Sequence, residues 1–154
     1  LEKLAQAVDQ EYESCFAEKK SFFGTEQIEE AMQKVMDQYA GGIGTHYQFN
    51  EKQLAMAEEK IKKLQILAKG LAAADMHELM FIYELKERLT VCLTVIAHLR
   101  ARKETRWHRF AENLDYPEKS DAWLCYVNSK KNGDQITMIR RDLVKGGETY
   151  EHRD

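Results

Sequence analysis

The chain has 154 residues and a formal net charge of −3, with 44% hydrophobic and 32% charged residues. These values are typical of one folded domain and give no electrostatic reason to expect a nucleic-acid partner. Only one proline and eight glycines occur among many alanine, leucine, glutamate and lysine residues, so we expect a mainly α fold. The chain begins at Leu1, already inside a helical pattern, which suggests a piece of a longer protein.

The cysteines and the longest apolar run bear on where the protein works. The three cysteines are Cys15, Cys92 and Cys125. They are odd in number and widely separated, which predicts reduced thiols in a cytoplasmic protein. The apolar run over residues 89–99 is interrupted by two threonines and His98 and is flanked by charges, so we expect no membrane insertion.

Apolar side chains at helical spacing predict two helices near the start of the chain. The first helix is expected over residues 2–19, and its apolar stripe is Leu4, Val8, Tyr12, Cys15 and Phe16. Residues 21–24 break the pattern. The second helix is then expected to begin with Thr25 as its N-cap and to end at Gly41 and Gly42.

A loop with three glycines over residues 41–50 separates the second predicted helix from the third. No strand precedes these glycines and no P-loop or dinucleotide spacing occurs, so we interpret the loop as a connector rather than a phosphate cradle. Asn50 followed by Gln53 resembles a capping box and predicts the start of a third helix that ends near Gly70.

Asp75 is the predicted cap of the fourth helix, which continues to about Arg102. Apolar residues cover most of its circumference, and the remaining polar line holds Thr90, Thr94 and His98. A helix that is apolar nearly all round is normally surrounded by other elements. We therefore expect it at the centre of an up-and-down helical bundle of three to four helices, similar to a spectrin repeat.

The chain changes character after the fourth helix. Residues 107–121 are predicted to be irregular. Asn132 and Gly133 lie between the apolar runs 123–127 and 136–139, which predicts a small β-hairpin. Residues 145–154 are charged and are expected to form a loose end. We expect a bundle over 1–103 and a C-terminal extension over 104–154, packed on the bundle as one domain.

The sequence contains no complete catalytic or metal-binding motif. The five histidines are scattered, and no Glu-x-x-His pair or His pair at helical spacing exists, so we expect no metal site. His98 is interpreted as a histidine that is hydrogen-bonded within the bundle. No nucleophile elbow or phosphate-binding motif is present, and we assign no catalytic residue.

A polar cluster just after the fourth helix supplies the candidate site. Its members are Glu104, Arg106, Trp107, His108, Arg109, Asp115 and Tyr116. Arginines suit the bidentate recognition of a carboxylate or a phosphate, so the cluster is a candidate for anion binding or for contact with another domain. The alternative is a buried ion-pair network that fastens the end of the helix to the loop and the hairpin.

This tail resembles a known family. The run from Lys103 to Trp107, followed by Asp115-Tyr116-Pro117, Trp123 and residues 125–129, resembles the C-terminal region of adenylylsulfate reductase flavoprotein subunits. More broadly it is similar to the C-terminal helical domain of succinate dehydrogenase, fumarate reductase and L-aspartate oxidase flavoproteins. The resemblance covers about residues 30–144, and its specific part is the tail.

The match in the tail is incomplete. Glu104, Arg106, Asp115, Tyr116 and Pro117 keep the family pattern. Trp107 stands where the broad family has a glycine, and the adjacent His108-Arg109 pair does not keep the family spacing.

The resemblance implies a FAD-dependent oxidoreductase as the parent protein, reducing a sulfur oxyanion nucleotide or acting on a dicarboxylate. It implies that this chain supports the FAD and catalytic domains, binds no cofactor itself and has no independent activity. Its implied partner is the FAD-binding domain of the same polypeptide, with an iron–sulfur subunit left open. The segment over residues 103–117 is then expected to expose an apolar or arginine-rich surface where the FAD domain docks.

Two other hypotheses compete with this one. The chain is alternatively a freestanding helical module for protein–protein interaction, without a catalytic role. A third possibility, the least favoured, is an independent enzyme that uses Arg106 and His108.

Overall fold

The computed structural model describes residues 2–15 and 23–144, except for the side chains of residues 11, 12 and 15. The predicted end of the first helix at residues 16–19, the first half of the break at 21–24 and the charged terminus at 145–154 lie outside the described residues. The helices are α1 (Glu2–Cys15), α2 (Thr25–Tyr39), α3 (Glu51–Ala68) and α4 (Met76–Ala101). The strands are β1 (Gln48–Phe49), β2 (Glu112–Asn113), β3 (Cys125–Asn132) and β4 (Gln135–Asp142).

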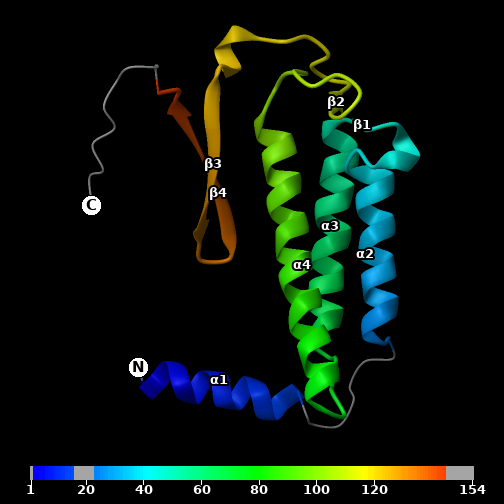
Figure 1. Cartoon of the computed structure of the whole chain (residues 1–154), viewed down its shortest axis with the longest axis vertical. Helices are drawn as coiled ribbons and strands as arrows, with labels where there is room; N and C mark the ends of the chain where they lie inside the picture. Colours follow the sequence, from blue (N-terminus) through cyan, green and yellow to red (C-terminus); the bar gives the residue numbers. More distant parts are fainter. Residues whose placement is uncertain (1, 16–22, 145–154) are drawn as a thin grey trace.

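Helices α2, α3 and α4 lie side by side and form the bundle (Figure 1). Their buried side chains make one apolar core, which includes Ile28, Leu54, Ile61, Leu85 and Leu89. The fold class predicted from the sequence, a mainly α helical bundle followed by a small β-hairpin, is confirmed.

The helix starts follow local capping chemistry. Asn50 accepts a hydrogen bond from Gln53 N at 2.8 Å, and Asp75 accepts one from Glu78 N at 2.9 Å, as predicted for α3 and α4. The predicted cap of α2 is wrong by one residue. Gly24 is the N-cap, and its N–H donates to the side chain of Gln27 at 2.9 Å.

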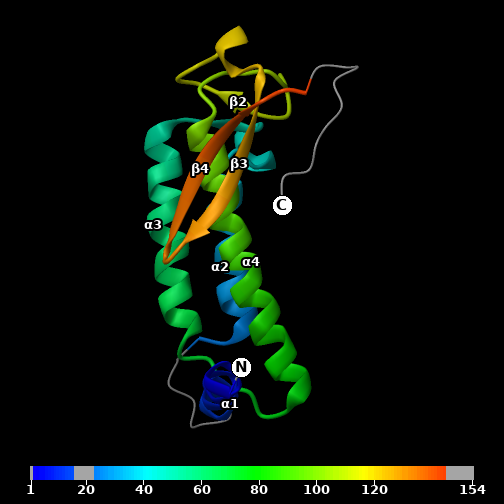
Figure 2. The ribbon, with the colours of Figure 1, turned by 90° about the vertical axis from the view of Figure 1, so that its left-hand side faces the viewer.

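Two expectations about the bundle are wrong. Helix α1 projects sideways from one end of the bundle rather than packing along its flank (Figures 1 and 2), and Leu4 and Val8 are exposed. Helix α4 is not surrounded, because Val91 and Val95 on one of its faces are exposed by 59% and 41%. Helix α4 therefore has more apolar surface than the described part of the chain covers.

The hairpin of β3 and β4 lies along α4 (Figure 2). Its register pairs Asn132 with Gln135, so the turn consists of Gly133 and Asp134. Gly133 has a φ of 59°, the sign that the first turn position of a type II′ hairpin requires. Half-buried Val127 and Met138 alternate with exposed residues along the strands.

A short parallel pairing joins the glycine loop to the tail. Strand β1 pairs with β2, and Gln48 lies opposite Glu112. The sequence interpretation treated both segments as irregular, so this pairing corrects it. The pairing brings the tail over the end of the bundle where α3 begins and α4 ends, as Figure 1 shows.

Candidate functional site

Glu104 is the centre of the tail, and its side chain is fully buried. Its Oε1 accepts hydrogen bonds from Arg102 Nη1 at 2.7 Å and from Arg106 Nε at 2.9 Å. Its Oε2 accepts from Arg106 Nη2 at 2.9 Å and from Ser120 N at 3.0 Å. The Arg106 contact is thus bidentate, the geometry in which a guanidinium holds a carboxylate most specifically.

These contacts decide the charge of Glu104. Burial alone raises the pKa of this carboxyl group, but the hydrogen bonds from Arg106, Ser120 N and Arg102 outweigh burial and lower the pKa to about 2. The same hydrogen bond raises the pKa of Arg106. The network therefore stays ionised across the neutral range.

Arg102 extends the network to the hairpin. Its Nη1 donates to Trp123 O at 2.8 Å and its Nη2 donates to Cys125 O at 2.9 Å. The ring of Trp123 also lies near two guanidiniums, with Arg102 5.9 Å and Arg140 4.3 Å from its centroid. The end of α4 is thereby fastened to the beginning of β3.

Two buried polar residues that the sequence interpretation did not select complete the tail. Thr105 Oγ1 donates to Tyr116 O at 2.9 Å and accepts from Asn113 N at 3.0 Å. The side chain of Asn113 accepts from Asp115 N at 3.1 Å. Their burial was not predictable from local periodicity, because their partners lie in the same irregular segment.

Asp115 joins the tail to the bundle. Its Oδ2 accepts a hydrogen bond from Glu51 N, in the first turn of α3, at 2.7 Å. A carboxylate suits this position because the first turn of a helix has free N–H groups and a positive dipole end. Tyr116 lies beside Lys103, whose Nζ is 5.8 Å from the ring centroid. Both residues therefore brace the tail from within the chain.

The loop from Trp107 to Phe110 protrudes from this braced segment. Trp107 and Phe110 are exposed by 70% and 72%. Phe110 N and Ala111 N both donate to Trp107 O, and Arg109 takes a left-handed φ of 69°. This conformation is costly for a non-glycine residue and persists only where its surroundings hold it.

Glu112 holds the loop. Its carboxylate accepts from Arg109 N at 2.6 Å and lies 3.1 Å from His108 Nδ1. The hydrogen bond from Arg109 N, together with His108, lowers the pKa of Glu112. The loop is therefore fixed at its base while its two aromatic rings face outward.

A groove lies between the second half of α4, the start of the tail and β3. Val95, Leu99, Phe49 and Val127 supply apolar lining, and Trp107 also lines it. The polar lining consists of Thr94, His98, Arg102, Glu104 and Arg106. His98 is half-buried, and its imidazole ring makes no hydrogen bond to any residue within 2–15 and 23–144, so the side-chain hydrogen bond predicted inside the bundle is absent there.

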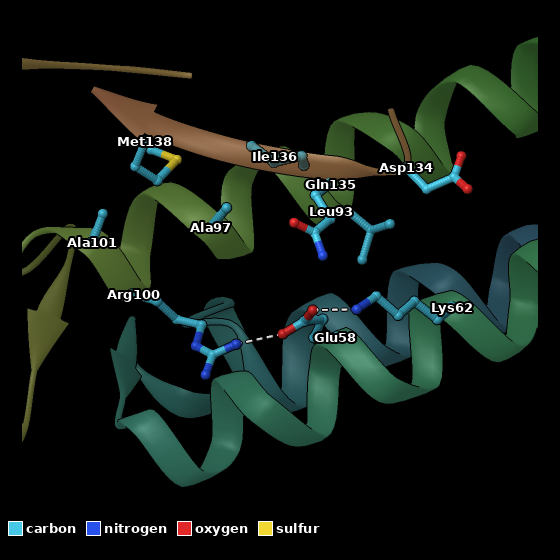
Figure 3. A pocket seen from close by; sticks show the side chains of 10 residues that line it. All are labelled: Glu58, Lys62, Leu93, Ala97, Arg100, Ala101, Asp134, Gln135, Ile136 and Met138. Carbon is cyan, nitrogen blue, oxygen red and sulfur yellow. Dashed lines mark hydrogen bonds and ion pairs between the residues drawn. The ribbon is translucent and has the colours of Figure 1, made fainter. Parts of the chain in front are cut away.

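A second groove lies between the hairpin tip and helices α3 and α4 (Figure 3). Three of its charged groups satisfy one another: Glu58 bridges Arg100 and Lys62, as the dashed lines in Figure 3 mark. Arg100 also donates through Nε to Glu51 at 2.8 Å. Asp134, in the hairpin turn, also lines this groove and makes no ion pair with another described residue.

The glycine loop does not fit a cofactor phosphate. Gly44 N donates to Asp37 Oδ1 at 3.0 Å, and a Cβ placed on Gly42 would lie 2.3 Å from Asp37 Cα. The glycines are needed so that the loop approaches α2 closely, and a carboxylate of the chain already occupies the position of an anion. A phosphate group therefore does not fit this loop, which the sequence analysis interpreted as a connector.

The structure brings the seven candidate residues into one segment but gives them different surroundings. Glu104 and Arg106 face each other in the network, and Asp115 contacts α3. Trp107, His108, Arg109 and Tyr116 are exposed. Among the described residues, no group of three or more side chains is arranged to hold a metal ion, and no helix is long and apolar enough to cross a membrane.

Comparison with known proteins supports one family. A sequence family described as fumarate reductase flavoprotein C-term matches residues 29–148. The subunit alpha of adenylylsulfate reductase from Megalodesulfovibrio gigas is 34% identical over 98 residues, which cover 63% of this chain and 15% of that protein.

Solved structures agree. Adenylylsulfate reductase from the hyperthermophile Archaeoglobus fulgidus superposes with a TM-score of 0.79 and 36% identity, covering 86% of this chain and 21% of that one. Quinol fumarate reductase from E. coli shares the fold, with a TM-score of 0.78 over 97% of this chain and 26% of that one, at 19% identity. The chain thus spans about a fifth of the length of these relatives.

Proposed function

Because the chain belongs to the family of fumarate reductase flavoprotein C-terminal domains, we propose that it is a docking domain. It packs against the FAD-binding part of a longer flavoprotein subunit and braces it. Residues 103–117, in this proposal, are the contact segment. The roles of Glu104, Arg106 and Asp115 are to hold that segment in shape, and the exposed members of the cluster make the contact.

The observation that carries the proposal is the exposed Trp107–Phe110 loop, which hydrogen bonds hold at its base. Trp107, Phe110 and Leu114 are exposed by 70%, 72% and 51%, which supports the expectation of an exposed apolar or arginine-rich docking surface around residues 103–117. Exposed aromatic side chains on a fixed backbone are typical of interface anchors, since little conformational entropy is lost on binding. The exposed Val91 and Val95 on α4 extend the apolar surface.

The activity in this proposal belongs to the parent subunit. The 36% identity to an adenylylsulfate reductase favours an oxidoreductase that acts on a sulfur oxyanion nucleotide, with a dicarboxylate as the alternative substrate. FAD is bound outside this chain, which agrees with the occupation of the glycine loop by Asp37. The relative named subunit alpha supports a further subunit, for which we propose an iron–sulfur protein. The free thiols of Cys92 and Cys125 support a cytoplasmic location.

The proposal is tested in the full-length subunit. The double substitution Trp107→Ala/Phe110→Ala removes both anchors, and the temperature of flavin release is followed by flavin fluorescence. We expect release at a clearly lower temperature, because truncating interface anchors typically costs about 2 kcal/mol or more each. The matched control is Ile66→Ala on α3, which removes another exposed apolar side chain (66%). An equal release temperature in the two variants would contradict docking through this loop.

A further inference from the structure

The groove beside Trp107 combines an apolar wall with uncommitted hydrogen-bond donors. Val95, Leu99 and Phe49 provide the wall, and His98 and Arg106 contribute to the lining. Arg106 uses Nε and Nη2 for Glu104 and Ser120, whereas its Nη1 makes no hydrogen bond within the described part of the chain. The His98 ring is likewise uncommitted within those residues.

The groove offers no carboxylate of its own to these donors. Glu104 is its acidic lining residue, and both of its oxygens already accept hydrogen bonds from the arginines and Ser120 N. Two guanidiniums share this one carboxylate, so one positive charge of the network is left without a directly bonded partner. A partly desolvated guanidinium is stabilised most by a second carboxylate that reaches it from outside.

We propose that the groove receives an acidic side chain from the FAD-binding part of the same polypeptide. The carboxylate accepts hydrogen bonds from Arg106 Nη1 and from His98, and an apolar side chain beside it packs between Trp107 and Val95. This inference rests on the proposed docking function and adds the chemistry of the segment that docks. Charge complementarity and the shape of the lining argue for one carboxylate next to an apolar residue, rather than for a purely apolar strand.

The test places an amine in the groove of the full-length subunit. His98→Lys and, separately, Trp107→Lys are treated with a carbodiimide, which joins an amine to a carboxylate that it touches. Cross-linked peptides are then identified by mass spectrometry. The control is Ile66→Lys on the exposed side of α3. Trp107→Lys changes a side chain that is 70% exposed and so carries the test even if His98→Lys does not fold.

We expect both groove lysines to join one aspartate or glutamate that precedes Leu1, with a yield on the order of tenfold above the control because of the high effective concentration in a docked pair. A product confined to this chain, to a second copy or to another subunit would overturn the inference, as would a yield equal to the control. If these cross-links fail while Trp107→Ala/Phe110→Ala still lowers the flavin-release temperature, docking stands and the acidic occupant is wrong.

Discussion

The bundle interior and the tail interior are equally buried but differ in chemistry. Leu85 and Leu89 of α4 are 0% exposed and pack against other apolar side chains. Glu104 and Thr105 are 4% and 1% exposed, yet they are held by directed hydrogen bonds. An apolar core tolerates changes of shape that keep its volume, whereas a buried network tolerates no loss of a partner. The comparison suggests that the bundle provides stability and the tail provides a fixed shape.

The strongest test of this comparison is Glu104→Gln, which keeps the shape and removes the charge. Arg102 and Arg106 then face a neutral amide, and we expect the free energy of unfolding to fall by about 4 kcal/mol, as for a buried ion pair that loses one member. Urea unfolding measures the change. Leu89→Met, a volume-conserving control in the bundle, is expected to cost less than about 1.5 kcal/mol. Equal losses of unfolding free energy in the two variants would contradict the difference drawn between the apolar core and the buried network.

Acid should act on the same carboxylate. Its pKa is about 2 in the folded chain against an ordinary glutamate value of 4.5, so its contribution to stability is complete above pH 4.5 and is lost as the pH falls toward 2. We expect the unfolding free energy of the wild type to decrease over this window, and Glu104→Gln to remove part of that decrease. Urea titrations at several pH values would show it. Parallel pH profiles for the two proteins would contradict the assignment.

Leu89→Ala tests the bundle side. The side chain is fully buried in α4, and we expect a loss of about 3 kcal/mol from lost transfer energy and the remaining cavity. The loss should leave the slope of the acid profile unchanged, because no titrating group is touched. Thermal unfolding at pH 7 and pH 3 separates the two effects. A change in the slope of unfolding free energy against pH would show that the bundle and the tail do not contribute independently to stability.

Asp115→Ala tests the contact between the two regions. Removing the carboxylate that accepts from Glu51 N should cost about 1 kcal/mol, the usual value of a helix N-terminal cap. Asp115→Asn keeps an acceptor oxygen and is expected to retain most of that stability. The measurement is again urea unfolding. A larger loss in the asparagine variant than in the alanine variant would argue against a capping role.

The smallest effect is expected for Trp107→Ala in this chain alone. The indole is 70% exposed, so we expect a change within about 0.5 kcal/mol. Thermal unfolding of the isolated chain checks this. In the full-length subunit, by contrast, Trp107→Ala/Phe110→Ala is predicted to lower the flavin-release temperature clearly. A large loss in the isolated chain would mean that Trp107 supports the tail rather than a partner.

The sequence predicted most of the bundle because its signals are local. Periodic apolar residues and the caps Asn50 and Asp75 define α3 and α4 within a few neighbours along the chain. The expectation that α4 is covered all round was wrong for a physical reason. Apolar residues occur on every face of α4 that is buried in the complete protein. In our proposal, one of those faces is buried against a domain outside this chain.

The tail was less predictable because its partners are remote. Asp115 and Glu51 are 64 residues apart, and no local pattern links a carboxylate after the last helix to the start of α3. The charged members of the cluster were selected from the sequence by residue type and family resemblance. Thr105 and Asn113 carry no such signal, since isolated polar residues are usually exposed. Their burial comes with the hydrogen bonds that they make within the irregular tail itself.

The pairing of β1 with β2 also has a consequence for the order of folding. Most contacts among α2, α3 and α4 join helices that follow one another in the chain, whereas β1 and β2 close a loop that contains all of α3 and α4. Closing such a loop costs entropy that only a formed bundle can offset. We expect the bundle to form first and the tail to close last, so the docking surface is completed only when the rest of the chain is already folded.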